Sequence, residues 1–393
     1  MTRDAVIVDV VRTASGRGKP GGALSAIKPA DLLARVLTGV VERNGLESRA
    51  IDDVLVGCVT QIGEQSTNIA RIATLSARFD VRVPAATVDR QCGSSQQAAM
   101  FAAQGIMTGS ADIVIAAGVE SMSRVPLGSG ATTGSPYGDG IAARFPEGLV
   151  NQGVSAELIA AKWGFNRAQL DAFSAESHRR AAAAAESGAF DAEILPVETP
   201  DGLHTRDETV RPQTTAEGLG GLAPVFATDE MRARFPDLDW SITAGNSSPL
   251  TDGASAALIM GADTAASLGF RARARFHSFA VVGDDPLFML TGPIPATHRI
   301  LERSGLSFDQ LDAYEINEAF ASVPLAWAAE FDADPAKLNP WGGAIALGHA
   351  VGASGTRLLA TMVSYLEATG GRYGLQVMCE GGGMANATIV ERL

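Results

Sequence analysis

Cys92 stands in a sequence setting that suits a nucleophile. It lies in Asp89-Arg-Gln-Cys-Gly-Ser-Ser, between an apolar strand-like run at 83–88 and an Ala-rich run that we expect to be helical. A thiol at a strand-to-helix turn lies near free backbone N–H groups and the positive end of a helix dipole, and both lower a thiol pKa. The alternative is a small core side chain, because free cysteine is among the most buried residue types.

Three further segments, all in the last quarter of the chain, favour catalysis. His349 ends Gly342-Gly-Ala-Ile-Ala-Leu-Gly-His, where a neutral imidazole could take a proton from a thiol. Cys379 opens Cys379-Glu-Gly-Gly-Gly, in which the thiol could move a proton and the glycines could aim N–H groups at an oxyanion. Asn317, in Glu315-Ile-Asn-Glu-Ala-Phe, could hold a water or a carbonyl oxygen. The structural alternatives are a satisfied histidine, a core cysteine in a glycine-rich hairpin and a helix N-cap.

Composition and charge exclude several classes of protein. The chain has 393 residues, 46% hydrophobic and 19% charged, which predicts a globular protein of two or three domains. The formal net charge of −13, without a dense Lys/Arg run, argues against a nucleic-acid partner. Three cysteines give no disulfide framework, and no spacing supports a metal site. No leader, peroxisomal ending or membrane-length apolar run is recognisable, so we expect a cytoplasmic protein without membrane association.

The order of strand-like and helical runs predicts an α/β core with an insertion. Strands are expected at 5–11, 53–59 and 113–117, with a helix at 30–41, which implies a mostly parallel, helix-covered sheet. Residues 122–243 differ, with many turns and an Ala-rich helix at 168–186, and the alternation returns at 254–260. We therefore expect an N-terminal core half at 1–121, completed by about 244–270, an inserted loop domain at 122–243 and a C-terminal core half at 271–393.

The second half of the chain echoes the first. Asp112-Ile-Val-Ile-Ala-Ala-Gly-Val-Glu-Ser-Met is similar in pattern to Leu375-Gln-Val-Met-Cys-Glu-Gly-Gly-Gly-Met, and Cys92-Gly-Ser-Ser parallels Gly352-Ala-Ser-Gly-Thr, each before a helical run. A duplication explains both similarities. The alternative is that any two strand–helix units look alike.

Taken together, the motifs resemble those of one family, the thiolases. Cys92-Gly-Ser-Ser, Asn317-Glu-Ala-Phe, the His349 motif and Cys379-x-Gly-Gly-Gly stand in the order and spacing of that family, and the similarity spans nearly the whole chain. The resemblance implies a thiolase fold, which is a duplicated five-layer α/β/α/β/α core with an inserted loop domain, usually in a homodimer or homotetramer. It also implies acyl-CoA and CoA as small-molecule partners, with coenzyme A a co-substrate and no permanently bound cofactor or metal.

The resemblance also implies a role for each motif residue. Cys92 would be the acylated nucleophile, His349 its activator and Cys379 the general acid/base. Asn317 would hold a water that, with His349 Nε2, forms an oxyanion hole for the thioester enolate. The N–H groups of Cys92 and Gly381 would form a second hole for the tetrahedral oxyanion. The positions that line the pantetheine tunnel of CoA in the family are Ser248, Ala319 and Phe320, while Cys58 matches no catalytic position and is expected to be a buried strand residue.

Four departures from the family pattern bear on substrate and rate. Ala350 replaces the proline after the catalytic histidine, and Trp341 replaces an asparagine, with its ring expected near the water site. Ala223 replaces the arginine that contacts adenine. Asn151-Gln152 replaces the His-Met of acetoacetyl-specific members, which removes a side chain that closes the pocket behind a short acyl group. The last change favours a broad, long or bulky acyl preference.

The sequence therefore predicts thiolytic cleavage of a 3-ketoacyl-CoA to acetyl-CoA and a shortened acyl-CoA through an acyl-Cys92 intermediate, in fatty-acid or steroid β-oxidation. One alternative is a biosynthetic acetyl-CoA acetyltransferase that forms acetoacetyl-CoA. Another is a decarboxylating condensing enzyme of ketoacyl-synthase type, which would lack the second catalytic cysteine. A third is a catalytically impaired thiolase-like binding subunit. The acyl chain, the physiological direction and the choice of dimer or tetramer stay open.

Overall fold

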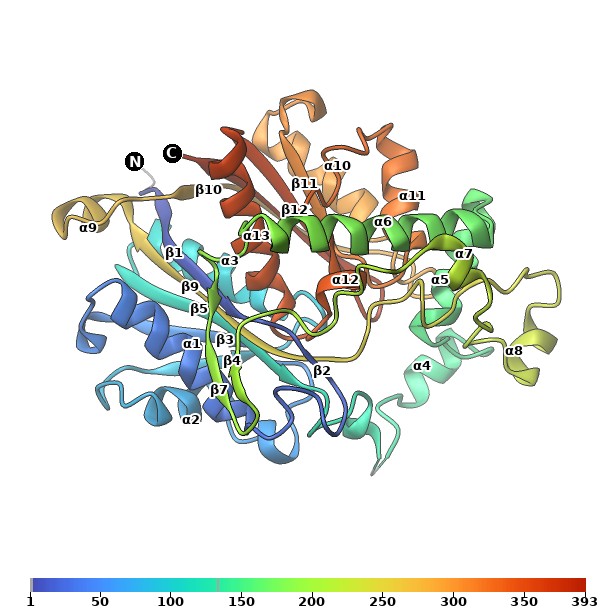
Figure 1. The fold of residues 1–393 in the computed structure, drawn as a ribbon, viewed down its shortest axis with the longest axis horizontal. Helices are drawn as coiled ribbons and strands as arrows, with labels where there is room; N and C mark the ends of the chain where they lie inside the picture. The colour runs from blue at the N-terminus through green and yellow to red at the C-terminus, as the bar shows by residue number, and fades with distance from the viewer. Residues whose placement is uncertain (1–2, 133) are drawn as a thin grey trace.

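A computed structural model describes residues 3–132 and 134–393, and a large sheet of eleven strands runs through it (Figure 1). Nine strands follow one path, in the order β11-β12-β13-β10-β1-β9-β5-β3-β4, while β2 pairs with β9 and β6 with β1. The first six strands are β1 (Ala5–Thr13), β2 (Gly16–Arg17), β3 (Asp53–Gly57), β4 (Ala85–Val88), β5 (Ile113–Ser121) and β6 (Ile194–Leu195). The others are β9 (Thr251–Gly261), β10 (Ala274–Gly283), β11 (Ala313–Ile316), β12 (Tyr373–Glu380) and β13 (Met384–Arg392).

The sheet contains the same strand pattern twice. β1 pairs antiparallel with β9, β9 antiparallel with β5, and β5 parallel with β3. In the same way β10 pairs antiparallel with β13, β13 antiparallel with β12, and β12 parallel with β11. Even the irregularities correspond, because the register shifts between Ile7 and Asp9 in β1 and between Phe276 and Ser278 in β10. This agreement confirms the duplication that the sequence predicted. The expectation of a mostly parallel sheet is wrong, because six of the ten strand pairings described in this sheet are antiparallel.

Helices complete five layers. α3 (Ser94–Met107) and α13 (Ser354–Thr369) lie between the two sets of strands and share one apolar cluster with both. α1 (Pro29–Arg43) and α2 (Ile69–Ser76) cover the outer face of the first set. α10 (Pro293–Ser304) and α11 (Ser322–Phe331) cover the outer face of the second. The result is the expected α/β/α/β/α order (Figure 1).

The two central helices come close because a glycine lies at their contact. A Cβ at Gly355, in the first turn of α13, would overlap the backbone nitrogen of Gln96 in α3. Both helices are buried along most of their length, so each packs against strands on two sides. This packing fixes the start of α3, and Cys92 lies directly before that start.

Residues between β5 and β9 form mostly helices and loops. The helices are α4 (Asp139–Arg144), α5 (Gln152–Trp163), α6 (Arg167–Glu186), α7 (Ala216–Gly220) and α8 (Asp229–Arg234), with a small hairpin of β7 (Val197–Thr199) and β8 (Gly202–His204). α6 begins with a capping box, in which the Asn166 and Gln169 side chains each accept from the other's backbone N–H. Two short helices complete the chain, α9 (Ala262–Ser267) and α12 (Ala344–Leu347).

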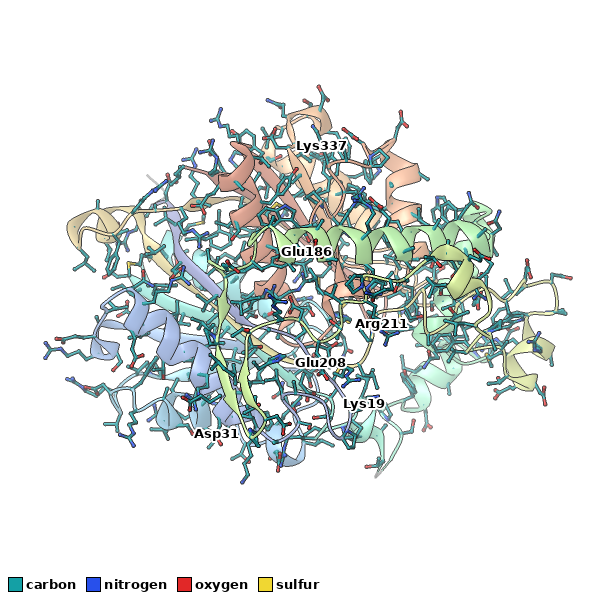
Figure 2. The ribbon with its side chains drawn as sticks, viewed as in Figure 1. Lys19, Asp31, Glu186, Glu208, Arg211 and Lys337 are labelled. Atoms are coloured by element: carbon teal, nitrogen blue, oxygen red, sulfur yellow. The ribbon has the colours of Figure 1, made fainter. Side chains whose placement is uncertain are left out.

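Figure 2 draws the side chains on this ribbon, and the labelled Asp31 on α1 and Glu186 on α6 are both exposed. Among the helices that the structure describes, none combines the length and the apolar character needed to cross a membrane.

Candidate active site

Cys92 lies in the tight turn between β4 and α3, as the sequence predicted. The turn is held by the Ser94 hydroxyl, which accepts from the Arg90 backbone N–H at 2.9 Å and donates to the Gln91 carbonyl. Gln91 adopts a left-handed φ of +48°, which is uncommon for a residue with a side chain. The Cys92 side chain is 6% exposed, so the turn presents a nearly buried thiol.

Burial raises the pKa of the Cys92 thiol well above its ordinary value. Negative charge at Cys379 or Glu380 would raise it further, while the backbone N–H groups of Cys92 and Gly381 lower it. Burial therefore opposes the effect expected of the helix start, because desolvation disfavours the thiolate. A neutral thiol needs a base that removes its proton as it attacks.

The hydrogen bonds of Ser354 favour the His349 tautomer with its proton on Nδ1, which leaves Nε2 free to act as a base. Its Nδ1 lies 2.7 Å from Ser354 Oγ, and that hydroxyl gives its hydrogen to the Ala350 carbonyl at 2.9 Å. Because a hydroxyl has one hydrogen, His349 Nδ1 must donate to Ser354. Burial and the positive charge of Arg357 lower the pKa of His349 to about 3, so the ring is neutral. The His349 backbone N–H donates to Thr251 Oγ1 at 2.9 Å and fixes the loop.

Asn317 connects the histidine to the second cysteine. Its Nδ2 lies 3.5 Å from His349 Nε2 and 3.9 Å from Cys379 Sγ. The helix N-cap interpretation is wrong, because α11 begins only at Ser322 and Ala321 is its N-cap. The Oδ1 of Asn317 is buried and accepts no hydrogen bond within the described chain, so it can bind a polar substrate atom or a water.

Cys379 is fully buried near the end of β12, and its burial raises the thiol pKa to about 12. The amide of Asn317 opposes this shift by hydrogen bonding to the sulfur. The following glycines turn the chain into β13, and Gly382 and Gly383 have left-handed φ values of +84° and +78°. Cys379 is therefore both part of a glycine-rich hairpin and a member of the polar group around Asn317.

Two side-chain amides, those of Gln91 and Gln152, lie next to Gly381. A Cβ placed on Gly381 would lie 3.0 Å from Gln91 Oε1 and 3.3 Å from Gln152 Nε2. The sequence had indicated Gln152 only as a departure from the family, and Gln91 only as part of the Cys92 motif. Their convergence depends on the contact between the β4–α3 turn, the start of α5 and the β12–β13 hairpin, which no local pattern shows.

The three residues expected to contact CoA lie together. Ser248 donates to the Ala319 carbonyl from its backbone N–H at 3.0 Å and from its hydroxyl at 3.1 Å. Phe320 packs edge-on against Phe226, with the ring centroids 5.9 Å apart. Ala319 and Phe320 share an apolar cluster with Cys379, so this wall adjoins the second cysteine.

Two of the departures leave the polar group intact. The Trp341 ring packs against Phe190 and Tyr365, at centroid distances of 5.9 and 5.3 Å, in a separate apolar cluster with residues of α6 and α12. These contacts do not bear out the expectation that the ring crowds the Asn317 water site. Ala350 borders a small cavity of about 20 Å³, which Ser354 and Arg357 also line.

Two buried glutamates position the loops of the site, and the sequence analysis assigned neither a role. Glu120 accepts from the Gly352 backbone N–H at 3.0 Å, close after His349. Glu318 accepts from the Ile345 backbone N–H at 3.1 Å, shortly before His349. The other donors to these carboxylates are Val59, Thr60, Gln65, Ser177 and Asn339. Each glutamate lies inside a motif that the sequence analysis had already quoted. That position was the only sequence feature that could have indicated a role for either carboxylate.

The third cysteine, Cys58, lies outside this group of residues. Cys58 directly follows β3, is fully buried and has a strongly raised pKa because of its burial. Over the described ranges, His, Cys, Asp and Glu side chains form no group of three or more that could hold a metal ion.

Comparisons with known proteins agree with this geometry. Residues 5–263 match the family model "Thiolase, N-terminal domain" and residues 270–392 match "Thiolase, C-terminal domain". The chain is 46% identical to the steroid 3-ketoacyl-CoA thiolase of Mycobacterium tuberculosis, over 99% of this chain and 94% of that protein. It is 43% identical to a 3-ketoacyl-CoA thiolase of Vibrio cholerae, over 98% and 99% of the two chains. The crystal structure of the Bacillus anthracis acetyl-CoA acetyltransferase matches with a TM-score of 0.89 at 34% identity, covering 100% of this chain and 99% of the other.

Proposed function

This chain belongs to the thiolase family, and we propose that it cleaves 3-ketoacyl-CoA with CoA to acetyl-CoA and a shortened acyl-CoA, in fatty-acid or steroid β-oxidation. The names of full-length relatives at 42–46% identity support this acyltransferase reaction. The observation that carries the proposal is the set of two cysteines, a neutral histidine and an asparagine, drawn together from four separate segments. A biosynthetic acetyl-CoA acetyltransferase is the second candidate, and the Bacillus anthracis structure bears that name.

In the first half-reaction Cys92 is acylated. His349 Nε2 takes the proton from the Cys92 thiol while the sulfur attacks the 3-keto carbon. The backbone N–H groups of Cys92 and Gly381, which favour negative charge on this thiol, would donate to the oxyanion that forms there. The bond between C2 and C3 then breaks, the acyl group stays on Cys92, and acetyl-CoA leaves as its enolate.

Asn317 and Cys379 complete that step. The enolate oxygen would lie against His349 Nε2, which now carries the proton, and a water held by Asn317. Cys379 donates its proton to C2 of the enolate, which gives acetyl-CoA. A thiol with a pKa of about 12 holds its proton until so basic a carbon arises, which suits an acid in this role.

In the second half-reaction CoA removes the acyl group. The Cys379 thiolate takes the proton of the incoming CoA thiol, and the CoA sulfur attacks the acyl-Cys92 carbonyl. The tetrahedral intermediate expels Cys92, which recovers its proton from His349. Every proton removed in the first half-reaction is thereby returned, and coenzyme A acts only as a co-substrate.

We place the pantetheine arm of CoA along Ser248, Ala319 and Phe320, because this wall adjoins Cys379. We also propose a homodimer or homotetramer. In the described part of the chain β4 ends the sheet with no strand on one side. The exposed Ile72 and Leu75 lie on α2, which contacts β4, and the exposed Val81 lies in the loop that leads into β4. Light scattering after gel filtration tests this assembly, and a monomer at micromolar concentration would contradict it.

A mass measurement tests the chemical roles. After incubation with an acyl-CoA, the intact protein should carry one acyl group on Cys92. The group should persist in Cys379→Ala, which lacks the second proton transfer, and should be absent from Cys92→Ser. An acyl group on Cys58 instead would refute the assignment of the nucleophile.

A further inference from the structure

The carboxyl group of Glu380 lies next to Gly93, the residue after Cys92, and has no hydrogen-bond partner among the described residues. Glu380, the last residue of β12, is fully buried, and neither of its oxygens accepts a hydrogen bond from the residues that the structure describes. The reaction described above does not use it. An ionised carboxylate in such surroundings is costly unless it is paired, so the chemistry of its neighbours decides which form is present.

Glu380 and Asn386 occupy the space beside Gly93. A Cβ on Gly93 would overlap Glu380 Oε1 and would lie 2.8 and 2.9 Å from Asn386 Nδ2 and Oδ1. Asn386, on β13, donates from Nδ2 to the Gly93 carbonyl at 3.0 Å. Gly93 follows Cys92 and is the N-cap of α3. The side chains of Glu380 and Asn386 therefore pack against the turn that carries Cys92.

A protonated Glu380 meets the hydrogen-bonding needs of both side chains. Asn386 Oδ1 is buried and receives no hydrogen bond from the described residues. A carboxylate has no hydrogen to give it, whereas a carboxylic acid has one O–H donor. The two oxygens lie around the same missing Cβ of Gly93, so a small rotation brings them into hydrogen-bonding distance.

The surrounding charges do not reverse this preference. Arg90 favours the carboxylate but is not within ion-pair distance of it, and its Nη1 lies 4.0 Å from Met384 Sδ instead. Asp89 disfavours the carboxylate, and a charge on Glu380 would raise the pKa of the Cys92 and Cys379 thiols. Burial is the largest effect and raises the pKa of Glu380 to about 8.

We propose that Glu380 is a positioning residue that works in its protonated form. Its O–H donates to Asn386 Oδ1, the pair holds Gly93 and the Cys92 turn, and its neutrality keeps a negative charge away from both thiols. The inference rests on the proposed role of Cys92. When Glu380 loses its proton, the hydrogen bond to Asn386 is lost and the sulfur that must become negative gains a negative neighbour.

The kinetic test is the rate at which acetyl-CoA acylates Cys92, followed by intact mass from about pH 6 to about pH 10. The wild-type rate should contain an alkaline fall with the ionisation of Glu380. Glu380→Gln cannot ionise but can still donate to Asn386, so it should lose that fall and stay within about threefold of wild type at neutral pH. Glu380→Ala should be about tenfold slower at every pH, because the turn loses its support.

Glu391→Gln is the matched control, since Glu391 is a carboxylate of the neighbouring strand that pairs with Arg275 and Arg372. Its pH profile should equal that of wild type. An alkaline fall that persists unchanged in Glu380→Gln, or a loss above about tenfold in that variant at neutral pH, overturns the proposal.

An infrared measurement is independent of the role of Cys92. Because other buried carboxyl groups such as Glu315 also have raised pKa values, the signal is the wild-type spectrum minus that of Glu380→Gln. This difference should contain a band of a protonated carboxyl group at neutral pH that fades as the pH rises, and its absence at neutral pH would show that Glu380 is ionised and overturn the inference. If no variant is acylated at Cys92, the proposed function fails, and the band still decides whether Glu380 holds a proton.

Discussion

The hydrogen bonds around His349 determine how it can act. Because Ser354 gives its only hydrogen to the Ala350 carbonyl, the imidazole must present an unprotonated Nε2 toward Asn317. The buried positive charge of Arg357 reinforces that state, since it disfavours a second proton on the ring. The hydroxyl of Ser354 therefore sets the tautomer of the base without touching the substrate.

Replacing Ser354 should lower the rate more than the affinity. We expect Ser354→Ala to lose about tenfold in kcat with KM within about twofold, because the ring loses the partner that orients it. Ser354→Thr should restore most of the rate, since it keeps the hydroxyl. The control is Ser364→Ala on the same helix, whose hydroxyl lies 3.5 Å from Arg273. Equal losses in Ser354→Ala and Ser364→Ala would mean that the effect is on folding.

Ala350→Pro should raise kcat modestly and leave KM little changed. Proline would fix its own φ and hold His349 extended. The ring would also enter the cavity of about 20 Å³ beside Ser354. The free energy of unfolding should rise by about 0.4–1 kcal/mol, because proline lowers the conformational entropy of the unfolded chain. Steady-state kinetics and thermal unfolding check this, and a large loss of activity would show that the loop follows another path.

Sequence motifs located the reactive side chains but not their ionisation. Cys92, Asn317, His349 and Cys379 were all predicted, and the structure brings them together. The raised pKa of Cys92 could not be predicted, because three of the residues that pack around it, Val351, Leu358 and Met378, lie more than two hundred residues later in the chain. The roles assigned to these residues stay predictions until the acyl-enzyme is measured.

At the scale of elements, the contact between α3 and α13 is the most sensitive to substitution. Gly355→Ala should destabilise the protein by about 1–3 kcal/mol or more, because its Cβ would overlap the Gln96 backbone. Gly105→Ala, also in a central helix, has open space and should stabilise by about 0.5–1 kcal/mol. Chemical denaturation of both variants measures the difference, and opposite signs are expected. A loss of stability in Gly105→Ala would contradict this account of the layer.

Most predicted elements exist, and their errors have a common cause. The strand expected at 5–11 is β1, and the helices at 30–41 and 168–186 are α1 and α6 with ends shifted by one or two residues. The helical run expected after Gly352-Ala-Ser-Gly-Thr begins earlier, at Ser354, because Gly355 is helical where it packs on Gln96. Hydrophobic patterns cannot show such tertiary contacts, nor the β1–β10 pairing that joins the two sets of strands. The domain boundaries at 121, 243 and 270 stay predictions.

At the scale of the whole enzyme, the size of the acyl group that the pocket accepts is still to be measured. With Asn151-Gln152 in place of His-Met, no methionine closes the pocket behind the acyl group. The side-chain amide of Gln152 lies next to Gly381 instead. Catalytic efficiency should rise with each added carbon from acetoacetyl-CoA, by at most about 0.8 kcal/mol per methylene. A panel of 3-ketoacyl-CoA substrates measures this, and Gln152→Met should flatten the trend. A strict preference for acetoacetyl-CoA would favour the biosynthetic alternative.

The position of β9 constrains how the chain folds as it is made. β9 lies between β1 and β5, yet it follows the whole segment from 122 to 250 in the sequence. At the pace of translation, the ribosome needs roughly ten seconds to make that segment, during which β1 and β5 lack the strand between them. Every residue of both strands is buried in the finished fold, so the nascent chain exposes these surfaces and unpaired strand edges in this interval. Slow synthesis, or a loop segment lengthened by insertion, should therefore increase dependence on chaperones without altering the finished enzyme.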